Sequence, residues 1–256
     1  MLEARHLAKR FYGVTAVEDA NFVVRPGEVI GYLGPNGSGK TTTVKMLTGL
    51  LEPSGGSVWF DGRDIARDLL GYRSRLGYVP EEPQLYPFLS GREYLELVGR
   101  LRELPERVIQ RKIPALLELL GIALAADQSI SSYSKGMKQK ILISAALLHN
   151  PDVLIFDEPD SGLDVTTMLV MRHLVHRFAA EGKAVLYSSH VLEVVEKLCT
   201  KVIVLHRGKV VADASVDALR SVVASHSLED VFAQLVLRND PESTARDIAD
   251  VVTSRA

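Results

Sequence analysis

The segment Gly34-Pro35-Asn36-Gly37-Ser38-Gly39-Lys40-Thr41 matches the pattern G-x-x-x-x-G-K-[ST] of a phosphate-binding loop. An apolar run, Val29 to Leu33, precedes it, and a helical pattern from Thr41 to Leu51 comes after it, so the loop has the required strand-to-helix context. Because glycines let backbone N–H groups face phosphate oxygens, we expect Lys40 to reach the β- and γ-phosphates and the Thr41 hydroxyl to bind Mg²⁺. The alternative is a glycine-rich turn with a solvated lysine, but a chance match has odds of about 1 in 100.

Short apolar and β-branched runs recur along the chain, each bounded by turn residues. They occupy residues 29–33, 57–60, 76–79, 153–156, 184–187 and 201–205. The runs that begin at Val29, Val153 and Ala184 are almost wholly apolar, which is typical of strands covered on both faces of a parallel sheet. Helical patterns at 41–51, 165–180 and 191–198 come after these runs, so the sequence predicts an α/β fold with a parallel sheet.

The middle of the chain breaks this alternation. Residues 82–150 contain no convincing strand, whereas residues 92–104, 106–120 and 135–149 carry apolar side chains at the spacing of helices. We therefore expect a mostly helical insertion over about residues 82–150. Near the C-terminus, Ser227 can cap a further helix. Its apolar face comprises Leu228, Val231, Phe232, Leu235 and Val236.

Composition excludes several classes of protein. The 256 residues are 46% hydrophobic and 24% charged, as in ordinary globular proteins, and 30 Lys and Arg against 32 Asp and Glu leave no basic footprint for nucleic acid. The longest stretches without a charged residue, Val29 to Gly39 and Ile141 to Pro151, are well short of the ~20 residues that cross a bilayer. The charged N-terminus does not resemble a secretory signal, so we expect a cytosolic protein. The lone Cys199 excludes an intramolecular disulfide and a cysteine metal cage.

Two adjacent carboxylates, Asp157 and Glu158, come directly after the apolar run from Val153 to Phe156. Such a placement is costly unless a cation or a reacting group uses them. We expect Asp157 to hold Mg²⁺ through water and Glu158 to face a water in line with the γ-phosphate. The alternative is a solvated turn that Pro159 closes.

Three further segments, in this order, complete a resemblance to a known family. They are Tyr133-Ser134-Lys135-Gly136-Met137-Lys138-Gln139, Ser161-Gly162-Leu163-Asp164 and Ser188-Ser189-His190. With the two motifs above, they resemble the nucleotide-binding subunits of ABC transporters over about residues 2–215. Pro80-Glu81-Glu82, the lysine-rich run after Ser134, and Ser227 to Phe232 are most similar to the ABC-2 type, which serves mainly exporters.

The resemblance implies a fold and a domain division. The expected fold is a P-loop NTPase core with a parallel sheet, an antiparallel β subdomain and a helical insertion. The ATPase domain would span residues 1–215, and residues 216–256 would form a C-terminal helical extension.

The resemblance also implies that ATP and Mg²⁺ bind, with Thr42 joining the phosphate loop at the nucleotide. Ser134 and Gly136 would close over the γ-phosphate held by a second protomer, in a head-to-tail homo- or heterodimer. Lys135, Lys138 and Lys140 begin that helix where acidic residues usually lie, which also favours an anion there, although a basic solvated helix face is the alternative.

The resemblance implies three further roles. His190 would contact the γ-phosphate and help to hold the attacking water, although a lone histidine is more often structural. Asp164 would link the two sites across the dimer, or act as the N-cap of the helix from Val165. Phe11, or the adjacent Tyr12, would stack on adenine, or lie in the core.

This sequence departs from the family pattern at two positions. Glu81 stands where most members have a glutamine; it can still reach Mg²⁺ or water but adds negative charge beside a triphosphate. Lys135 replaces the first glycine of the signature pair, which puts close backbone approach there in doubt, although its ammonium group can reach phosphate instead. We expect hydrolysis to survive both changes.

The sequence therefore predicts an ATPase subunit that powers a separate transmembrane permease subunit, for export, from the cytoplasmic face of the cell membrane. The apolar loop from Pro83 to Leu89 borders the expected docking groove, unless its side chains are buried in the insertion. The alternatives are a soluble ABC ATPase acting on nucleic acid or ribosomes, and a P-loop kinase or GTPase. A soluble ABC ATPase usually has long coiled-coil insertions or a second cassette, and neither is present in this sequence. A P-loop kinase or GTPase would give Ser134 and His190 no role.

Overall fold

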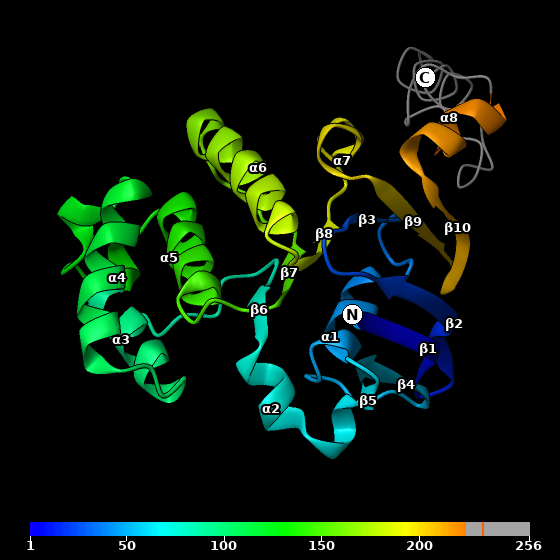
Figure 1. The fold of residues 1–256 in the computed structure, drawn as a ribbon, viewed down its shortest axis with the longest axis horizontal. Coiled ribbons are helices and arrows are strands. Elements are labelled where there is room, and N and C mark those ends of the chain that lie inside the picture. The colour runs from blue at the N-terminus through cyan, green and yellow to red at the C-terminus, as the bar shows by residue number, and fades with distance from the viewer. Residues whose placement is uncertain (224–231, 233–256) are drawn as a thin grey trace, which may run out of the picture.

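A single ten-stranded sheet organises the protein, whose computed structural model describes residues 1–223 and residue 232 (Figure 1). The strand order is β5-β4-β1-β2-β10-β9-β3-β8-β7-β6. The strands are β1 (Leu2–Phe11), β2 (Val14–Val24), β3 (Val29–Leu33), β4 (Gly55–Phe60), β5 (Arg63–Asp64), β6 (Leu76–Val79), β7 (Val153–Asp157), β8 (Ala184–Ser188), β9 (Lys201–His206) and β10 (Lys209–Ser215). The helices are α1 (Lys40–Leu47), α2 (Leu69–Ser74), α3 (Gly91–Leu101), α4 (Glu106–Leu119), α5 (Lys135–Leu147), α6 (Val165–Ala180), α7 (Leu192–Leu198) and α8 (Val216–Val223).

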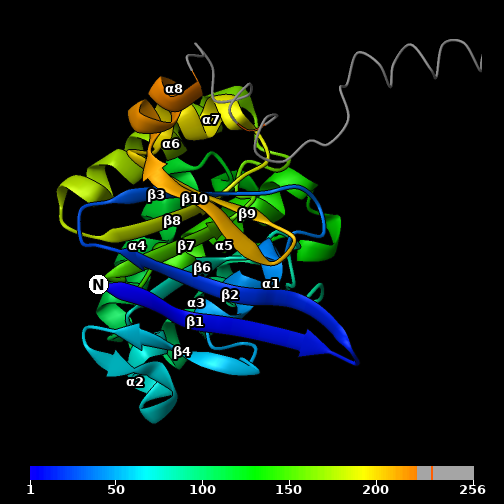
Figure 2. The same ribbon diagram turned by 90° about the vertical axis from the view of Figure 1, so that its right-hand side faces the viewer.

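The sheet has a parallel half and an antiparallel half, which confirms the predicted fold class. Strands β9, β3, β8, β7 and β6 pair in parallel, whereas β5, β4, β1 and β2 pair antiparallel. Every residue of β3, β7 and β8 is buried, as their apolar runs predict. In Figure 2 the strands β1, β2 and β4 form one side of the curved sheet, and α6 and α7 lie beyond the other.

Helices cover both faces of the parallel strands. Alternate strand residues such as Ile30 and Ile155 pack with Val44 and Leu47 of α1 in one apolar core. The intervening residues, such as Leu154, pack in a second core with α6 and α7. This two-layer covering leaves the carboxyl ends of β3, β7 and β8 as the place where polar side chains gather.

The helical insertion is also as predicted. Helices α3, α4 and α5 lie side by side, away from the N-terminal strands (Figure 1). A capping box begins α3: the Ser90 hydroxyl accepts from the Glu93 amide at 3.2 Å, and the Glu93 carboxylate accepts from the Ser90 amide at 2.8 Å. Within residues 1–223 no helix is both long and apolar enough to cross a bilayer.

Some elements differ from the sequence-based expectations. Strands β1, β2 and β10 were not predicted, because exposed and often charged residues interrupt their apolar positions. Helix α1 ends at Leu47, before the expected Leu51, because the chain turns at Gly49 with φ +68°. The helix expected from Ser227 lies outside the described residues, apart from Phe232. The domain limits 1–215 and 216–256 stay predictions.

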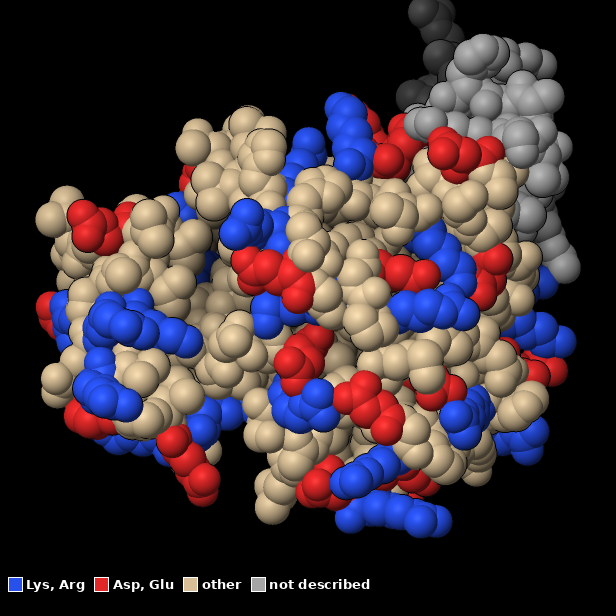
Figure 3. Space-filling model, viewed as in Figure 1, with Lys and Arg blue, Asp and Glu red and all other residues tan. Residues whose placement is uncertain are grey.

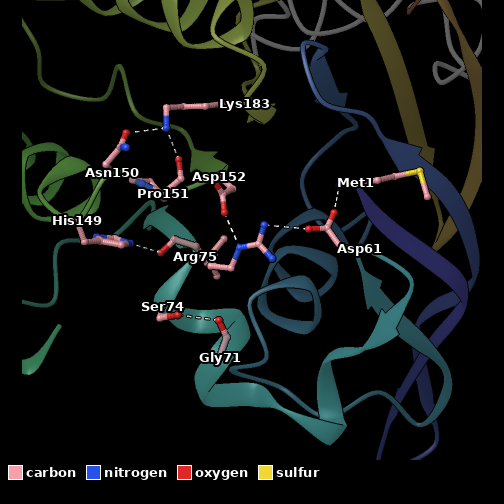
Figure 4. Close-up of polar contacts among 11 residues, drawn as sticks. Met1, Asp61, Gly71, Ser74, Arg75, His149, Asn150, Pro151, Asp152 and Lys183 are labelled. Carbon is pink, nitrogen blue, oxygen red and sulfur yellow. Dashed lines mark hydrogen bonds and ion pairs between the residues drawn. The ribbon is translucent and has the colours of Figure 1, made fainter. Parts of the chain in front are cut away.

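A polar network fastens the amino ends of the parallel strands (Figure 4). The Met1 amino group and the Arg75 guanidinium both contact Asp61, at 2.6 and 2.9 Å. Buried Lys183 donates to Asn150 Oδ1 at 2.8 Å and to the Pro151 carbonyl. This edge is opposite to the phosphate loop, so the network stabilises the scaffold without entering the site.

Candidate active site

A cavity of about 550 Å³ lies at the carboxyl ends of the parallel strands. The predicted residues that line it are Phe11, Asn36, Gly37, Gly39, Lys40, Thr41, Thr42, Glu81, Asp157, Glu158 and His190. Ala16 also lines the cavity; it comes from β2, a strand that the sequence pattern did not indicate. Tyr12 does not line it, so Phe11 is the aromatic side chain at this cavity.

The phosphate loop forms a tight cradle between β3 and α1. Gly37 and Gly39 adopt φ +77° and +106°, which favours glycine. A side chain at Gly34 would place Cβ within hard contact of the Leu205 carbonyl, and the buried Ser38 hydroxyl has no partner among the described residues. Gly34 and Pro35 line a neighbouring cavity with His190 rather than the main one. The first amides of α1 receive no side-chain cap, so they are available to an anion.

Lys40 spans its own loop. Its Nζ donates to the carbonyls of Gly34 at 2.6 Å and Pro35 at 3.3 Å. Burial lowers the pKa of Lys40, although nearby Glu158 and Asp157 oppose this shift. The Lys40 ammonium group therefore lies at the cavity, bonded to two carbonyls and to no carboxylate among the described residues.

Asp157 is a buried carboxylate, and only 1% of the residue is exposed. Its Oδ2 has no hydrogen-bond partner among the described residues. Burial raises the pKa of Asp157 to about 6; Glu81 and Glu158 add to the shift, and the neighbouring Ser188 side chain opposes it. A bound cation would relieve this desolvation.

The donor set fits Mg²⁺ held together with a nucleotide. In the described part of the chain, no group of three or more His, Cys, Asp or Glu side chains could hold a metal by itself. Mg²⁺ usually binds one or two carboxylates together with water and substrate phosphates, and Asp157, Glu81 and the Thr41 hydroxyl line one cavity.

Glu158 is held in an unusual conformation at the cavity wall. Its backbone has φ +50°, in the left-handed region that a non-glycine residue seldom adopts. Its amide donates to the Ser188 carbonyl at 3.0 Å, and Oε2 lies 2.7 Å from Nδ1 of His190. The carboxylate side chain is 12% exposed, whereas the His190 side chain is 73% exposed. This arrangement aims a carboxylate at the space beyond the phosphate cradle.

Ser134, Gly136 and Asp164 do not line the cavity. Ser134 caps α5 by accepting from the Met137 amide at 3.2 Å, and Asp164 caps α6 by accepting from the Thr167 amide at 2.8 Å. The Thr167 amide and hydroxyl, with Lys140, lower the pKa of Asp164. Lys135 Nζ donates to Ser161 Oγ at 2.6 Å, so it contacts its own chain. Gly136 packs closely on the loop of its own chain, because a Cβ there would meet the Gly162 carbonyl.

Comparisons with known proteins agree with this geometry. A sequence model of the family described as ABC transporter matches residues 17–161. The ABC transporter ATP-binding protein NatA of Bacillus subtilis (strain 168) is 36% identical over 226 residues, which are 88% of this chain and 92% of that protein. The chain belongs to the ABC transporter family. Within that family it is an ATP-binding ATPase subunit.

Further similarities extend over nearly all of this ABC ATPase. The Nod factor export ATP-binding protein I of Paraburkholderia xenovorans (strain LB400) is 34% identical over 245 residues, covering 95% of this chain and 79% of that protein. A solved structure described as an ATP binding subunit of an ABC transporter superposes with a TM-score of 0.86 at 33% identity. It covers 92% of this chain and 99% of that chain. The fold expected from the motifs is therefore confirmed.

Proposed function

We propose that the 550 Å³ cavity binds ATP with Mg²⁺ and hydrolyses it, and that the released energy drives a separate transmembrane subunit. The observation that carries this proposal is the convergence of Lys40, Thr41, Asp157, Glu158 and His190 on one cavity. Lys40 exchanges its two loop carbonyls for phosphate oxygens as the nucleotide enters. Thr41, Asp157 and Glu81 are the residues that would hold Mg²⁺, and the ion would neutralise charge on the phosphates.

The chemical step needs a base beside the attacking water. The oxygen of the attacking water forms a bond to the γ-phosphorus while Glu158 accepts a proton from that water. The bond between the γ-phosphorus and the β–γ bridging oxygen breaks, which gives ADP and phosphate. His190 lies 2.7 Å from Glu158 and orients its carboxylate. Phe11, which also lines the cavity, stacks on the adenine ring.

A second protomer completes the site. Ser134 and Gly136 lie outside their own cavity, at the start of α5, where Lys135 and Lys138 give the helix end a positive charge. We infer a head-to-tail dimer, with a second copy or a close relative, in which each α5 N-terminus covers the ATP of the other protomer.

The transmembrane partner docks beside Glu81. A second cavity of about 370 Å³ there is lined by Lys45, Glu81 and Glu82 among others. In the loop from Pro83 to Leu89, Leu85 and Leu89 pack on the core, whereas Tyr86 and Phe88 are 53% and 76% exposed. The loop is therefore buried through half of its apolar side chains and exposed through the other half, and the exposed pair is available to a partner.

The direction of transport and the location belong to the same proposal. Relatives are named for Nod factor export and for linearmycin resistance, which supports export. The protein then lies on the cytoplasmic face of the membrane, bound to its permease. Figure 3 shows acidic and basic side chains interspersed over one face of the molecule, so that face offers no continuous basic surface for nucleic acid.

Co-purification with the permease tests the docking surface. We expect Phe88→Asp to abolish recruitment to membranes that contain the permease while ATP affinity stays unchanged. Leu119→Asp is the matched control, because Leu119 is similarly exposed, at 78%, but lies at the end of α4. Retained recruitment of the Phe88 variant, or equal loss in the control, would contradict this surface.

A further inference from the structure

One face of α5 holds the loop that comes after Glu158. The contacting residues of α5 are spaced so that they share that face. Gln139 contacts the Pro159 carbonyl at 3.0 Å, Lys135 contacts Ser161 at 2.6 Å, and Lys140 contacts Asp164 at 3.2 Å. The loop therefore has contacts with α5 in addition to the turn hydrogen bonds from Ser161 to Glu158 and from Leu163 to Asp160.

Gln139 is the buried member of this set. It is 0% exposed, and its neighbours on α5, Ile141 to Ile143, are apolar core residues. Its Nε2 donates to the Pro159 carbonyl, and its Oε1 has no hydrogen-bond partner among the described residues. An amide that is only half satisfied in an apolar core is unfavourable for stability, so packing alone does not account for glutamine here.

The peptide that Gln139 contacts lies directly after the strained residue. Glu158 adopts φ +50° and is followed by a proline. Its own amide is bonded to the Ser188 carbonyl of β8 at 3.0 Å. The next carbonyl, that of Pro159, is bonded to α5 through Gln139. The backbone that aims the Glu158 carboxylate is thus fastened on one side to the sheet and on the other to α5.

We propose that Gln139 is a positioning residue for hydrolysis: its side-chain amide holds the Glu158–Pro159 segment so that the Glu158 carboxylate faces the attacking water. This inference rests on the proposed role of Glu158 as the base. Without the amide donor, the left-handed backbone at Glu158 relaxes, and the Glu158 carboxylate moves away from its position facing the attacking water. A misplacement of about 1 Å can cost about 10²-fold in rate.

The test compares Gln139→Met with wild type and with Ser144→Ala. Methionine has a similar size but no donor, whereas Ser144 is a fully buried α5 residue whose hydroxyl bonds within its own helix. We expect Gln139→Met to lower kcat by about 10- to 100-fold with KM for ATP unchanged. Ser144→Ala should retain the wild-type kcat.

A double variant separates positioning from a general structural effect. Single-turnover hydrolysis of radiolabelled ATP is measured for Glu158→Gln with and without Gln139→Met. If Gln139 acts through Glu158, the second substitution lowers the rate by less than about twofold. An additive loss in the double variant, or an unchanged kcat in the single variant, would overturn the inference.

Gln139→Asn keeps the test decisive if Gln139→Met does not fold. Asparagine retains the amide but withdraws it by one methylene group, so we expect the same loss of kcat and the same non-additivity. A wild-type rate for Gln139→Asn would contradict the proposal. Should Glu158→Gln alone retain the wild-type rate, it is the proposed function that fails, not the contact made by Gln139.

Discussion

Replacing Asp157 by asparagine should stabilise the nucleotide-free protein while it removes activity. Asp157 is buried, and its pKa is raised from 3.8 to about 6, first by burial and then by the nearby charges of Glu81 and Glu158. The folded state therefore holds this proton at pH values where the unfolded chain has lost it. The contribution of Asp157 to the free energy of unfolding is therefore highest below about pH 4, and it falls as the pH rises through about 6.

The difference between the two pKa values lowers the free energy of unfolding by about 3 kcal/mol at pH 7.5, and by about half of that at pH 5. Asparagine carries no charge and has nearly the same size as aspartate, so Asp157→Asn should gain close to these amounts. For a protein of this size, about 3 kcal/mol raises Tm by about 6–10 °C. Hydrolysis should be lost, because the variant lacks the carboxylate that we propose holds Mg²⁺.

Urea unfolding at pH 5 and pH 7.5, without nucleotide and with EDTA, measures this gain. Asp68→Asn is the control, since Asp68 is an exposed N-cap of α2 and asparagine caps equally well. The control should track the wild type at both pH values. If Asp157→Asn is less stable than the wild type at pH 7.5, or if its advantage is the same at both pH values, the assignment of a desolvated carboxylate is wrong.

Three further substitutions test the scaffold by urea unfolding. Gly136→Ala should cost about 1–3 kcal/mol and lower ATPase activity, because the added Cβ would clash with the Gly162 carbonyl; full activity would contradict that close contact. Ser90→Ala should cost about 1 kcal/mol through loss of the α3 capping box, with Ser90→Thr close to wild type, and equal stability of all three proteins would refute the cap. Lys183→Met should cost about 1–3 kcal/mol by leaving the buried Pro151 carbonyl unpaired, and a stabilised variant would show that the network is dispensable.

The parallel half of the sheet was predictable because its strands are buried on both faces. A strand such as Val153–Asp157 is then an unbroken apolar run, and the phosphate-loop motif indicates that a turn and a helix come directly after β3. Strand β10, Lys209–Ser215, has alternating exposed and half-buried residues, so its pattern is short and weak. It pairs with β9 through the two-residue turn Arg207-Gly208, a local hairpin signal that was missed beside this weak strand pattern.

The site was predictable where a motif brings several residues together, as at Lys40 and Thr41. The contact from Gln139 to Pro159 was not predictable, because it joins segments about twenty residues apart through side-chain packing. The left-handed backbone of Glu158 was not predictable either, because a non-glycine residue seldom adopts it. Gln139 lies within the signature-like segment, yet its pattern cannot show that its side chain is buried. A glutamine close to the apolar run from Ile141 to Ile143 was only a weak local signal.

The most direct test of the proposed mechanism compares ATP binding and ATP turnover in Glu158→Gln. The cavity geometry predicts that ATP affinity is retained, because the phosphate loop is intact, while steady-state hydrolysis falls by about 10²–10⁴-fold. Undiminished hydrolysis in this variant would contradict the central claim that Glu158 takes the proton from the attacking water.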